Sequence, residues 1–198
     1  MLQPDPNPRI PEVDIDPVFL DRWSPRSFLS EPLRPEEVLA LFEAARWAPS
    51  ASNDQPWLFI YAVSEKDRQR FAATLVEWNQ RWAPAAPLLG YVLARRNLAG
   101  KDRPNATALF DTGAAWMSLT LQAHKLGLHV HGMGGFDREK AIAALGVPAD
   151  RYEIIAAFVV GRRGNPADLP EDLRQREVPS LRKPLAEVAV EGRFPEGL

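Results

Sequence analysis

The sequence contains no cysteine, which excludes disulfide bonds, thiolate nucleophiles and cysteine-ligated zinc or iron–sulfur sites. An excess of charge of one sign is also missing: 24 basic side chains stand against 26 acidic ones, so the formal net charge is −2. A chain this close to neutral gives no reason to expect nucleic acid or an anionic membrane as a partner. The chemistry must therefore come from other side chains or from a bound group.

Long apolar runs are missing as well. The most apolar helical stretch, residues 106–126, contains Asp111, His124 and Lys125, which make it too polar for a membrane span. Residues 1–5 lack a basic start followed by an apolar run, so we expect no signal peptide and a cytoplasmic protein. With 198 residues and 45% apolar content, the chain suits one globular domain with a sizeable core.

Motifs for metal, nucleophilic and nucleotide chemistry are incomplete. His129 and His131 share one face of an expected strand, but a metal site needs a third ligand, and Asp137 is a natural helix N-cap. The sequence has no Gly-x-Ser-x-Gly elbow, no phosphate-binding P-loop and no strand-linked Gly-x-Gly-x-x-Gly. We therefore predict no metal site and name no catalytic side chain.

Apolar periodicity predicts four strands separated by helices. The strands are expected at residues 58–63, 88–94, 128–131 and 154–160, and the second is apolar throughout, which is typical of burial on both faces. Helices are expected from residue 35 to before 49, from 64 to about 79, over 106–126, and from 136 onward. Strands separated by helices give an α+β or α/β three-layer domain.

Three further segments lack this periodicity. Residues 1–16 carry several prolines, and we interpret them as an extended arm. Residues 95–105 are polar with glycine and proline, which predicts a mobile loop of the kind that often covers active sites. The segment 161–198 is rich in proline, arginine and glutamate. Because it has little core of its own, we expect it to wrap another surface, such as a second subunit.

Two arginine-containing motifs suit the binding of a phosphate. Arg22, Ser24 and Arg26 combine guanidinium forks with a hydroxyl, which is the usual way to hold a phosphate, and a surface salt-bridge cluster is an equal alternative. The basic pair Arg182 and Lys183 could close on the same phosphate from the tail. Together these residues suggest a bound cofactor that carries the chemistry itself.

Two loops could receive the rest of such a cofactor. Residues 48–57 hold two prolines, two serines, an asparagine and a glutamine, a composition that offers uncharged donors and acceptors to a flat polar heterocycle. The alternative is a turn whose polar groups satisfy their own backbone. Residues 132–135 contain three glycines, which would either bare the backbone to a ligand or form a plain turn.

These motifs resemble those of FMN-dependent nitroreductases, over about residues 18 to 190. The family's opening Arg-Arg-Ser-x-Arg-x-Phe is similar to residues 22–28, and its Ala-Arg-Trp-Ala-Pro-Ser-x-x-Asn-x-Gln-Pro-Trp is matched at residues 45–57. A Gly-Gly-Phe-Asp follows a short strand at residues 134–137, and a basic residue before Pro-Leu-x-Glu-Val occupies 182–188.

The resemblance implies an α+β fold, an FMN-dependent nitroreductase-like three-layer α-β-α sandwich with a mostly antiparallel central sheet. It also implies a homodimer with a domain-swapped C-terminal tail and two FMN sites at the interface. The FMN-binding domain would span residues 17–164, between the arm at 1–16 and the tail at 165–198 that wraps the partner. The implied cofactor-binding residues are Arg22, Trp23, Ser24, Arg26, Pro49, Ser50, Ser52, Asn53, Asn79, Met133, Gly134, Gly135 and Arg182.

Each group of these residues has an implied role. The arginines and Ser24 would hold the FMN phosphate and ribityl chain, with Trp23 contributing backbone, and residues 49–53 would reach the flavin of the other subunit. Asn79 would face the pyrimidine edge, and residues 133–135 would lie by the ring. The chain departs from the family at Trp82 and Ser180, where members often carry lysine.

The activity implied by the resemblance is a ping-pong oxidoreduction. NAD(P)H would deliver a hydride to FMN, and a nitroaromatic, a quinone or a free flavin would then take the electrons. Three alternatives stay open: a specialised flavin reaction such as dehalogenation or ring dehydrogenation, a flavin-binding protein without turnover, and a structural dimer whose arginines form ordinary salt bridges.

Overall fold

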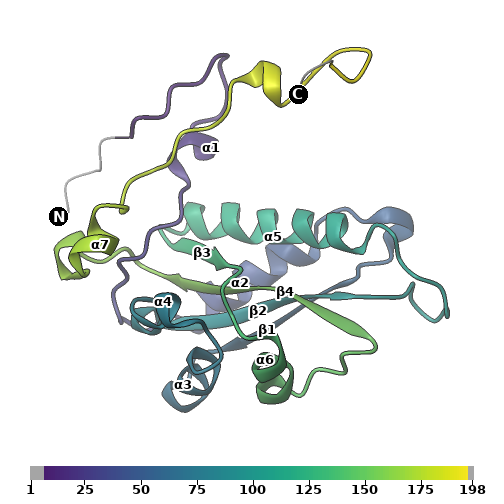
Figure 1. Cartoon of the computed structure of the whole chain (residues 1–198), viewed down its shortest axis with the longest axis horizontal. Helices are drawn as coiled ribbons and strands as arrows, with labels where there is room; N and C mark the ends of the chain where they lie inside the picture. The colour runs from purple at the N-terminus through teal and green to yellow at the C-terminus, as the bar shows by residue number, and fades with distance from the viewer. Residues whose placement is uncertain (1–6, 196–198) are drawn as a thin grey trace.

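A four-stranded antiparallel sheet forms the middle layer of the molecule (Figure 1). The computed structural model describes residues 7–195, so the first six residues of the predicted arm and the last three of the tail lie outside it. The strands are β1 (Trp57–Ala62), β2 (Leu88–Arg95), β3 (His129–Met133) and β4 (Tyr152–Gly161), in the order β1-β2-β4-β3. All four lie within two residues of their predicted bounds, and β3 is an edge strand.

Helices cover both faces of this sheet, which confirms the predicted three-layer α+β fold (Figure 1). One face carries α2 (Pro35–Arg46) and α5 (Ala108–Lys125), and the other carries α3 (Glu65–Ala72) and α6 (Arg138–Leu145). Short helices complete the chain: α1 (Val18–Asp21), α4 (Glu77–Gln80) and α7 (Glu171–Arg174), with the 3-10 turns η1 (Ala51–Asn53), η2 (Ala83–Ala85), η3 (Pro166–Asp168) and η4 (Leu185–Glu187).

The buried apolar side chains form two clusters, one on each face of the sheet. Alternate residues of β4 supply them: Phe158 belongs to the cluster under α2 and α5, and Val159 to the cluster under α3 and α6. The residues of β2 before Arg95 are buried, as predicted. At about 1.5–3 kcal/mol for each large apolar side chain, burial on both faces fixes the position of the sheet.

The ends of two helices follow their predicted signals. The side chain of Asp137 accepts a hydrogen bond from the backbone N–H of Lys140 and caps α6. Gly127 follows α5 with a φ of 70°, the left-handed conformation that ends helices and that glycine adopts without strain. Within residues 7–195, no helix combines the length and apolarity that a membrane crossing requires.

The prediction of a single helix from residue 64 to about 79 is wrong. Helix α3 ends at Ala72 and α4 begins at Glu77, because the chain between them turns away to bond the segment that follows β3. There the backbone N–H of Val76 donates to the carbonyl of Gly135 at 3.1 Å. This break places Asn79 on a separate turn of helix, where its side chain faces the end of β3.

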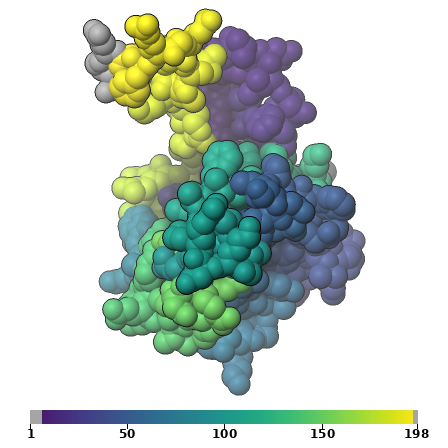
Figure 2. Space-filling view, turned by 90° about the vertical axis from the view of Figure 1, so that its right-hand side faces the viewer, coloured from purple at the N-terminus to yellow at the C-terminus, as the bar shows by residue number. Residues whose placement is uncertain are grey.

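The two ends of the chain run side by side and project beyond the sandwich (Figures 1 and 2). The guanidinium of Arg9 donates to the carbonyl of Ser180, and the backbone N–H of Leu185 donates to the carboxylate of Glu12. Earlier in the tail, Leu173 is fully buried against its own chain. The wrapping of a partner by residues 165–198, and the boundary at residue 164, stay predictions.

Candidate functional site

Five arginines from three separate segments surround one cavity of about 260 Å³. Arg22 and Arg26 come from the loop after α1, Arg9 comes from the N-terminal arm, and Arg176 and Arg182 come from the tail. The remaining lining residues are Trp23, Ser24, His131, Val178 and Ser180. The structure thus brings together the predicted loop residues 22–26 and the predicted tail arginine, and it adds two arginines that the sequence motifs did not indicate.

The positive charge of the five arginines in this cavity is only partly balanced, by Asp21 near Arg9 and by Glu177 near Arg26. Among residues 7–195, no salt bridge pairs Arg22, Arg26 or Arg182 with a carboxylate, and the buried Nε of Arg26 has no hydrogen-bond partner. Burial lowers the pKa of Arg22, and the positive charge of Arg182 lowers it further. Half-buried guanidinium groups that repel one another are typical of a site that receives an anion such as a phosphate.

A neutral histidine, His131, lines the cavity. The carbonyl of Pro25 can only accept, so the Nδ1 of His131, 2.8 Å away, carries the proton and Nε2 remains an acceptor. Burial lowers the pKa of His131 to about 4, so the ring is uncharged at neutral pH. The ring also lies beside the indole of Trp82, with ring centroids 4.5 Å apart, and the positive charge of Arg26 adds to the lowering of its pKa. The described residues contain no group of three His, Asp or Glu side chains that could hold a metal.

The backbone of β3 connects this cavity to a second one. Within the described part of the chain, β3 pairs with β4 alone, so its outer edge presents N–H and C=O groups that no strand satisfies. His131 lines the arginine cavity, whereas Gly132, Met133 and Gly134 line an apolar cavity of about 310 Å³ beside α5. At about 3.3 Å per residue, His131 lies on the order of 3–10 Å along the chain from the three residues that line the second cavity.

The two predicted glycines that follow β3 have different surroundings. A Cβ atom at Gly134 would meet no atom within 4 Å, so its bare backbone borders open space. A Cβ atom at Gly135 would lie 2.7 Å from the side-chain nitrogen of Asn79 and 2.8 Å from Val76. That nitrogen donates to the carbonyl of Gly135 at 2.9 Å. Gly134 therefore exposes the edge, and Gly135 allows Asn79 to pack closely against it.

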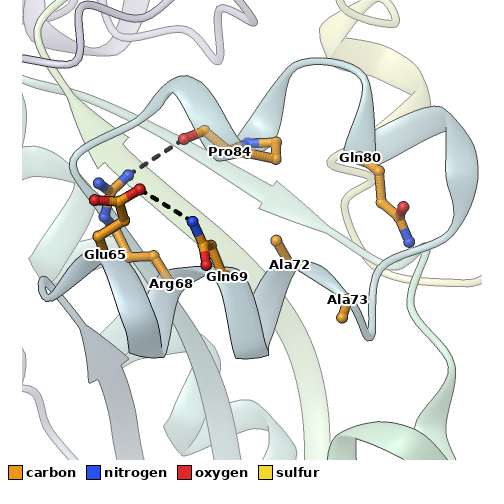
Figure 3. Close-up of a pocket in the computed structure, with 7 residues that line it drawn as sticks. All are labelled: Glu65, Arg68, Gln69, Ala72, Ala73, Gln80 and Pro84. Atoms are coloured by element: carbon orange, nitrogen blue, oxygen red, sulfur yellow. Dashed lines mark hydrogen bonds between the residues drawn. The ribbon is translucent and has the colours of Figure 1, made fainter.

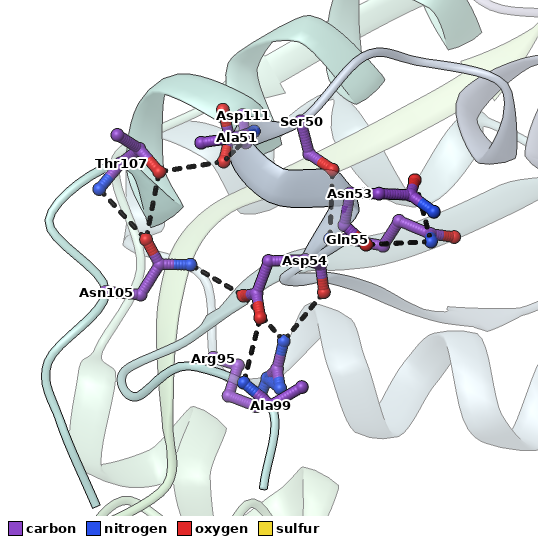
Figure 4. A network of polar contacts seen from close by, with 10 residues as sticks. All are labelled: Ser50, Ala51, Asn53, Asp54, Gln55, Arg95, Ala99, Asn105, Thr107 and Asp111. Atoms are coloured by element: carbon purple, nitrogen blue, oxygen red, sulfur yellow. Dashed lines mark hydrogen bonds and ion pairs between the residues drawn. The ribbon is translucent and has the colours of Figure 1, made fainter. Parts of the chain in front are cut away.

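Two carboxylates hold the polar loop at residues 50–55 (Figure 4). Asp54 pairs with Arg95 at 2.8 Å and accepts from the side chain of Asn105 at 2.7 Å and from the backbone N–H of Ala99 at 2.8 Å. Asp111, in the first turn of α5, accepts from the backbone N–H of Ala51 at 3.2 Å. The contacts of Asp54 tie the loop to the polar segment 95–105.

The same loop contains strained backbone. Ser52, Asn53 and Gln55 have φ values of 54°, 56° and 47°, a left-handed conformation that residues with a Cβ rarely adopt. Such strain persists where surrounding contacts fix the chain, and it is common at ligand sites. The predicted residues Pro49, Ser50, Ser52 and Asn53 are outside the linings of the arginine and apolar cavities. Within a single chain, these four residues therefore do not share a cavity with the arginines.

A third cavity, of about 360 Å³, lies between α3 and η2 and lacks these features (Figure 3). Its arginine, Arg68, donates to the carbonyls of Pro84 and Ala86 at 3.2 and 2.9 Å, and Gln69 donates to Glu65. The guanidinium of Arg68 is thus occupied by backbone carbonyls at and after η2. We place the candidate site at the smaller arginine cavity and the edge of β3, because the unbalanced charge and bare backbone are found there.

Comparison with known proteins places this geometry among flavoproteins. The family model described as "Nitroreductase family" matches residues 20–86 and 66–162. A protein of Ralstonia nicotianae named "Putative NADH dehydrogenase/NAD(P)H nitroreductase" is 27% identical over 147 residues, which are 65% of this chain and 75% of that protein. Nitrobenzene nitroreductase of Ectopseudomonas oleovorans is 40% identical over 63 residues, which are 32% of this chain and 27% of that protein.

A solved structure is similar over nearly the whole length. An oxidoreductase containing FMN is 46% identical and superposes with a TM-score of 0.92, covering 96% of this chain and 98% of that one. The likeness includes the arm and tail segments beyond residues 20–162. It therefore extends to the N-terminal arm, which supplies Arg9 to the cavity, and to the tail, which supplies Arg176 and Arg182.

Proposed function

The chain belongs to the nitroreductase family, and on that premise we propose that it is an FMN-dependent oxidoreductase that uses NAD(P)H to reduce nitroaromatics, quinones or flavins. The observation that carries the proposal is the pairing of two features on one strand. A five-arginine cavity lies at His131, and an exposed backbone edge with an apolar cavity lies at residues 132–134. An anionic tail joined to a flat ring fits this arrangement.

The residues present suit FMN in charge and in shape. A phosphate monoester is a dianion, and the half-buried guanidinium groups of Arg22 and Arg26 form no salt bridge within residues 7–195. The carboxylate of Glu177, which accepts from the backbone N–H of Arg26, is the acidic group that acts on the charge of Arg26. The orphaned Nε of Arg26 supplies a buried donor. The open space at Gly134 leaves room for a ring to approach the backbone. We assign Arg22, Trp23, Ser24, Arg26 and Arg182 to the phosphate and ribityl chain.

The remaining assigned residues position the ring. The backbone of Met133, Gly134 and Gly135, at the end of β3, would border the ring, and Asn79 fixes this segment through its bond to the carbonyl of Gly135. When bound, FMN supplies the hydride chemistry, alternating between NAD(P)H and the oxidant in a ping-pong cycle. The protein's part is binding, orientation and the exclusion of water, and we assign no catalytic acid or base.

We further propose that two copies of the chain form a homodimer with FMN at the interface. Leu109 and Phe110 on α5 are 57% and 82% exposed, and apolar side chains of the arm and tail such as Ile10, Val188 and Phe194 are also exposed. Exposed apolar groups on a long helix and on projecting ends support burial against a partner. The loop at residues 49–53 would then complete the partner's ring site.

The test is steady-state turnover by the FMN-reconstituted protein. We expect about one FMN per chain and continuous oxidation of NADH or NADPH when menadione or nitrofurazone is added in excess. Oxidation of a single equivalent of nicotinamide, followed by a halt despite excess acceptor, would instead identify a flavin-binding protein without turnover. Gel filtration of the same sample against the monomer mass of 22.1 kDa tests the dimer separately.

A further inference from the structure

We propose that Arg9 makes the N-terminal arm part of the phosphate site, by binding the cofactor phosphate directly beside the loop at residues 22–26. This inference rests on the proposed function. It concerns a residue that precedes the stretch matched by the nitroreductase family, which begins at residue 20. The family motifs therefore do not assign it.

The guanidinium of Arg9 is held in place by three backbone carbonyls. Its Nη1 donates to the carbonyls of Leu20 and Arg22, both at 2.8 Å, and its Nε donates to the carbonyl of Ser180 at 2.9 Å. Leu20 and Arg22 lie at the start of the loop at residues 22–26, and Ser180 lies in the tail. A rigid, planar donor group fixed by three acceptors loses little further entropy when it binds another group.

One nitrogen of this guanidinium remains for a ligand. Arginine carries five N–H donors, and among residues 7–195 no hydrogen bond uses Nη2 of Arg9. Arg9 lines the arginine cavity together with Arg22 and Arg182. The pKa of Arg9 is lowered from its ordinary value, first by burial and then by the positive charges of Arg182 and Arg22, which outweigh the opposing charge of Asp21. An anion between the three groups would relieve this repulsion.

The proposal has a consequence that separates it from a purely structural role. If Arg9 bonds the phosphate, its loss should weaken binding of FMN and leave binding of riboflavin, which lacks the phosphate, nearly unchanged. If Arg9 merely fastens the arm to the tail, its loss should disturb both ligands alike. The ratio of the two dissociation constants therefore reports on the contact itself.

The experiment measures the dissociation constants of FMN and riboflavin, by quenching of flavin fluorescence, for the wild type, Arg9→Ala, Arg9→Lys and the control Arg193→Ala. Arg193 is an exposed tail cation outside the cavity. We expect about a tenfold or greater loss of FMN affinity in Arg9→Ala, a smaller loss in Arg9→Lys, and changes below about twofold for riboflavin and for the control. Arg9→Gln, which retains a donor for a carbonyl, replaces Arg9→Ala if that variant is unfolded by circular dichroism.

The contradicting outcomes are distinct. Equal losses for FMN and riboflavin, or unchanged FMN affinity in Arg9→Ala, would overturn the inference and leave the proposed function standing. A wild-type protein that binds no FMN would overturn the proposed function and this inference together.

Discussion

The carboxylate of Glu177 receives the backbone N–H of Arg26 with both of its oxygens, at 2.8 and 3.0 Å, across 151 residues of sequence. One of these oxygens also accepts the N–H of Ser27 at 2.9 Å, and the Glu177 side chain is buried. A single tail carboxylate thus fixes the backbone of the loop that carries Arg26. The side chain of Arg26 in turn donates to the carbonyl of Arg176 at 3.3 Å, and Arg176 lines the arginine cavity.

Replacing Glu177 should therefore loosen the tail and weaken cofactor binding at once. We expect Glu177→Ala to lower the free energy of unfolding by about 2–3 kcal/mol, because it leaves buried N–H donors unsatisfied, and Glu177→Gln to cost less, because it keeps one acceptor. Urea unfolding and FMN titration measure the two effects. The control is Glu187→Ala in the exposed part of the tail, where neither quantity should change. Unchanged FMN affinity in Glu177→Ala would contradict the role of the tail.

Loss of an arginine from the loop at residues 22–26 should weaken the binding of FMN without unfolding the protein. Arg22→Ala and Arg26→Ala each remove one charge-assisted contact, which is worth about 1.5–3 kcal/mol, so the dissociation constant for FMN should rise about tenfold to a hundredfold. Lys66→Ala removes an exposed cation from α3 and serves as the control. Wild-type affinity in both arginine variants would contradict the assignment of this cavity to the phosphate.

The ion pair of Asp54 and Arg95 should hold the strained loop rather than the phosphate. The Asp54 side chain is 7% exposed and the Arg95 side chain 21% exposed, so Asp54→Ala leaves a partly buried cation unpaired and should cost about 3 kcal/mol. We expect the affinities for FMN and for riboflavin to fall by similar factors, because this loop is assigned to the partner's flavin ring, which both ligands share, and not to the phosphate. Asp102→Ala, which removes an exposed carboxylate from the connected segment, is the matched control. A loss of FMN affinity with unchanged riboflavin affinity would contradict this division of roles.

The buried imidazole of His131 should make the protein less stable in mild acid. The unfolded residue binds a proton below its ordinary pKa of 6.5, whereas the folded ring does so only below about 4. Acidification therefore favours the unfolded state between these values, by about 2 kcal/mol from pH 7 to pH 5. His131→Asn should remove this dependence of the free energy of unfolding on pH, and His124→Asn should leave it in place. The measurement is urea unfolding at each pH. The same pH dependence in the wild type and in His131→Asn would contradict the assignment.

The sequence predicted most of the fold because its signals are local. Alternating and continuous apolar runs located the four strands within two residues, and Asp137 and Gly127 marked helix ends through their own side-chain and backbone preferences. The prediction failed between residues 72 and 77, where the chain leaves the helix to bond the segment after β3. Helical periodicity carries no information about a partner about sixty residues away.

The site was predictable where a motif concentrates its residues. Arg22, Ser24, Arg26 and Arg182 were found from their types and spacing, and the structure gathers them around one cavity. Arg9 and Glu177 were missed because each stands alone in a segment without periodicity. Arg9 lies in a proline-containing arm that looks unstructured, and Glu177 is one acid in a charged tail. Their roles arise from tertiary contacts, which only the folded chain reveals.

The visible absorption spectrum of the purified protein, recorded under nitrogen before and after addition of NADH or NADPH, tests the central claim most directly. We predict flavin bands that bleach with at least one nicotinamide and return with menadione, nitrofurazone or air. A colourless protein that takes up no flavin after incubation with FMN would contradict the account and would leave the arginines of the cavity with a structural role.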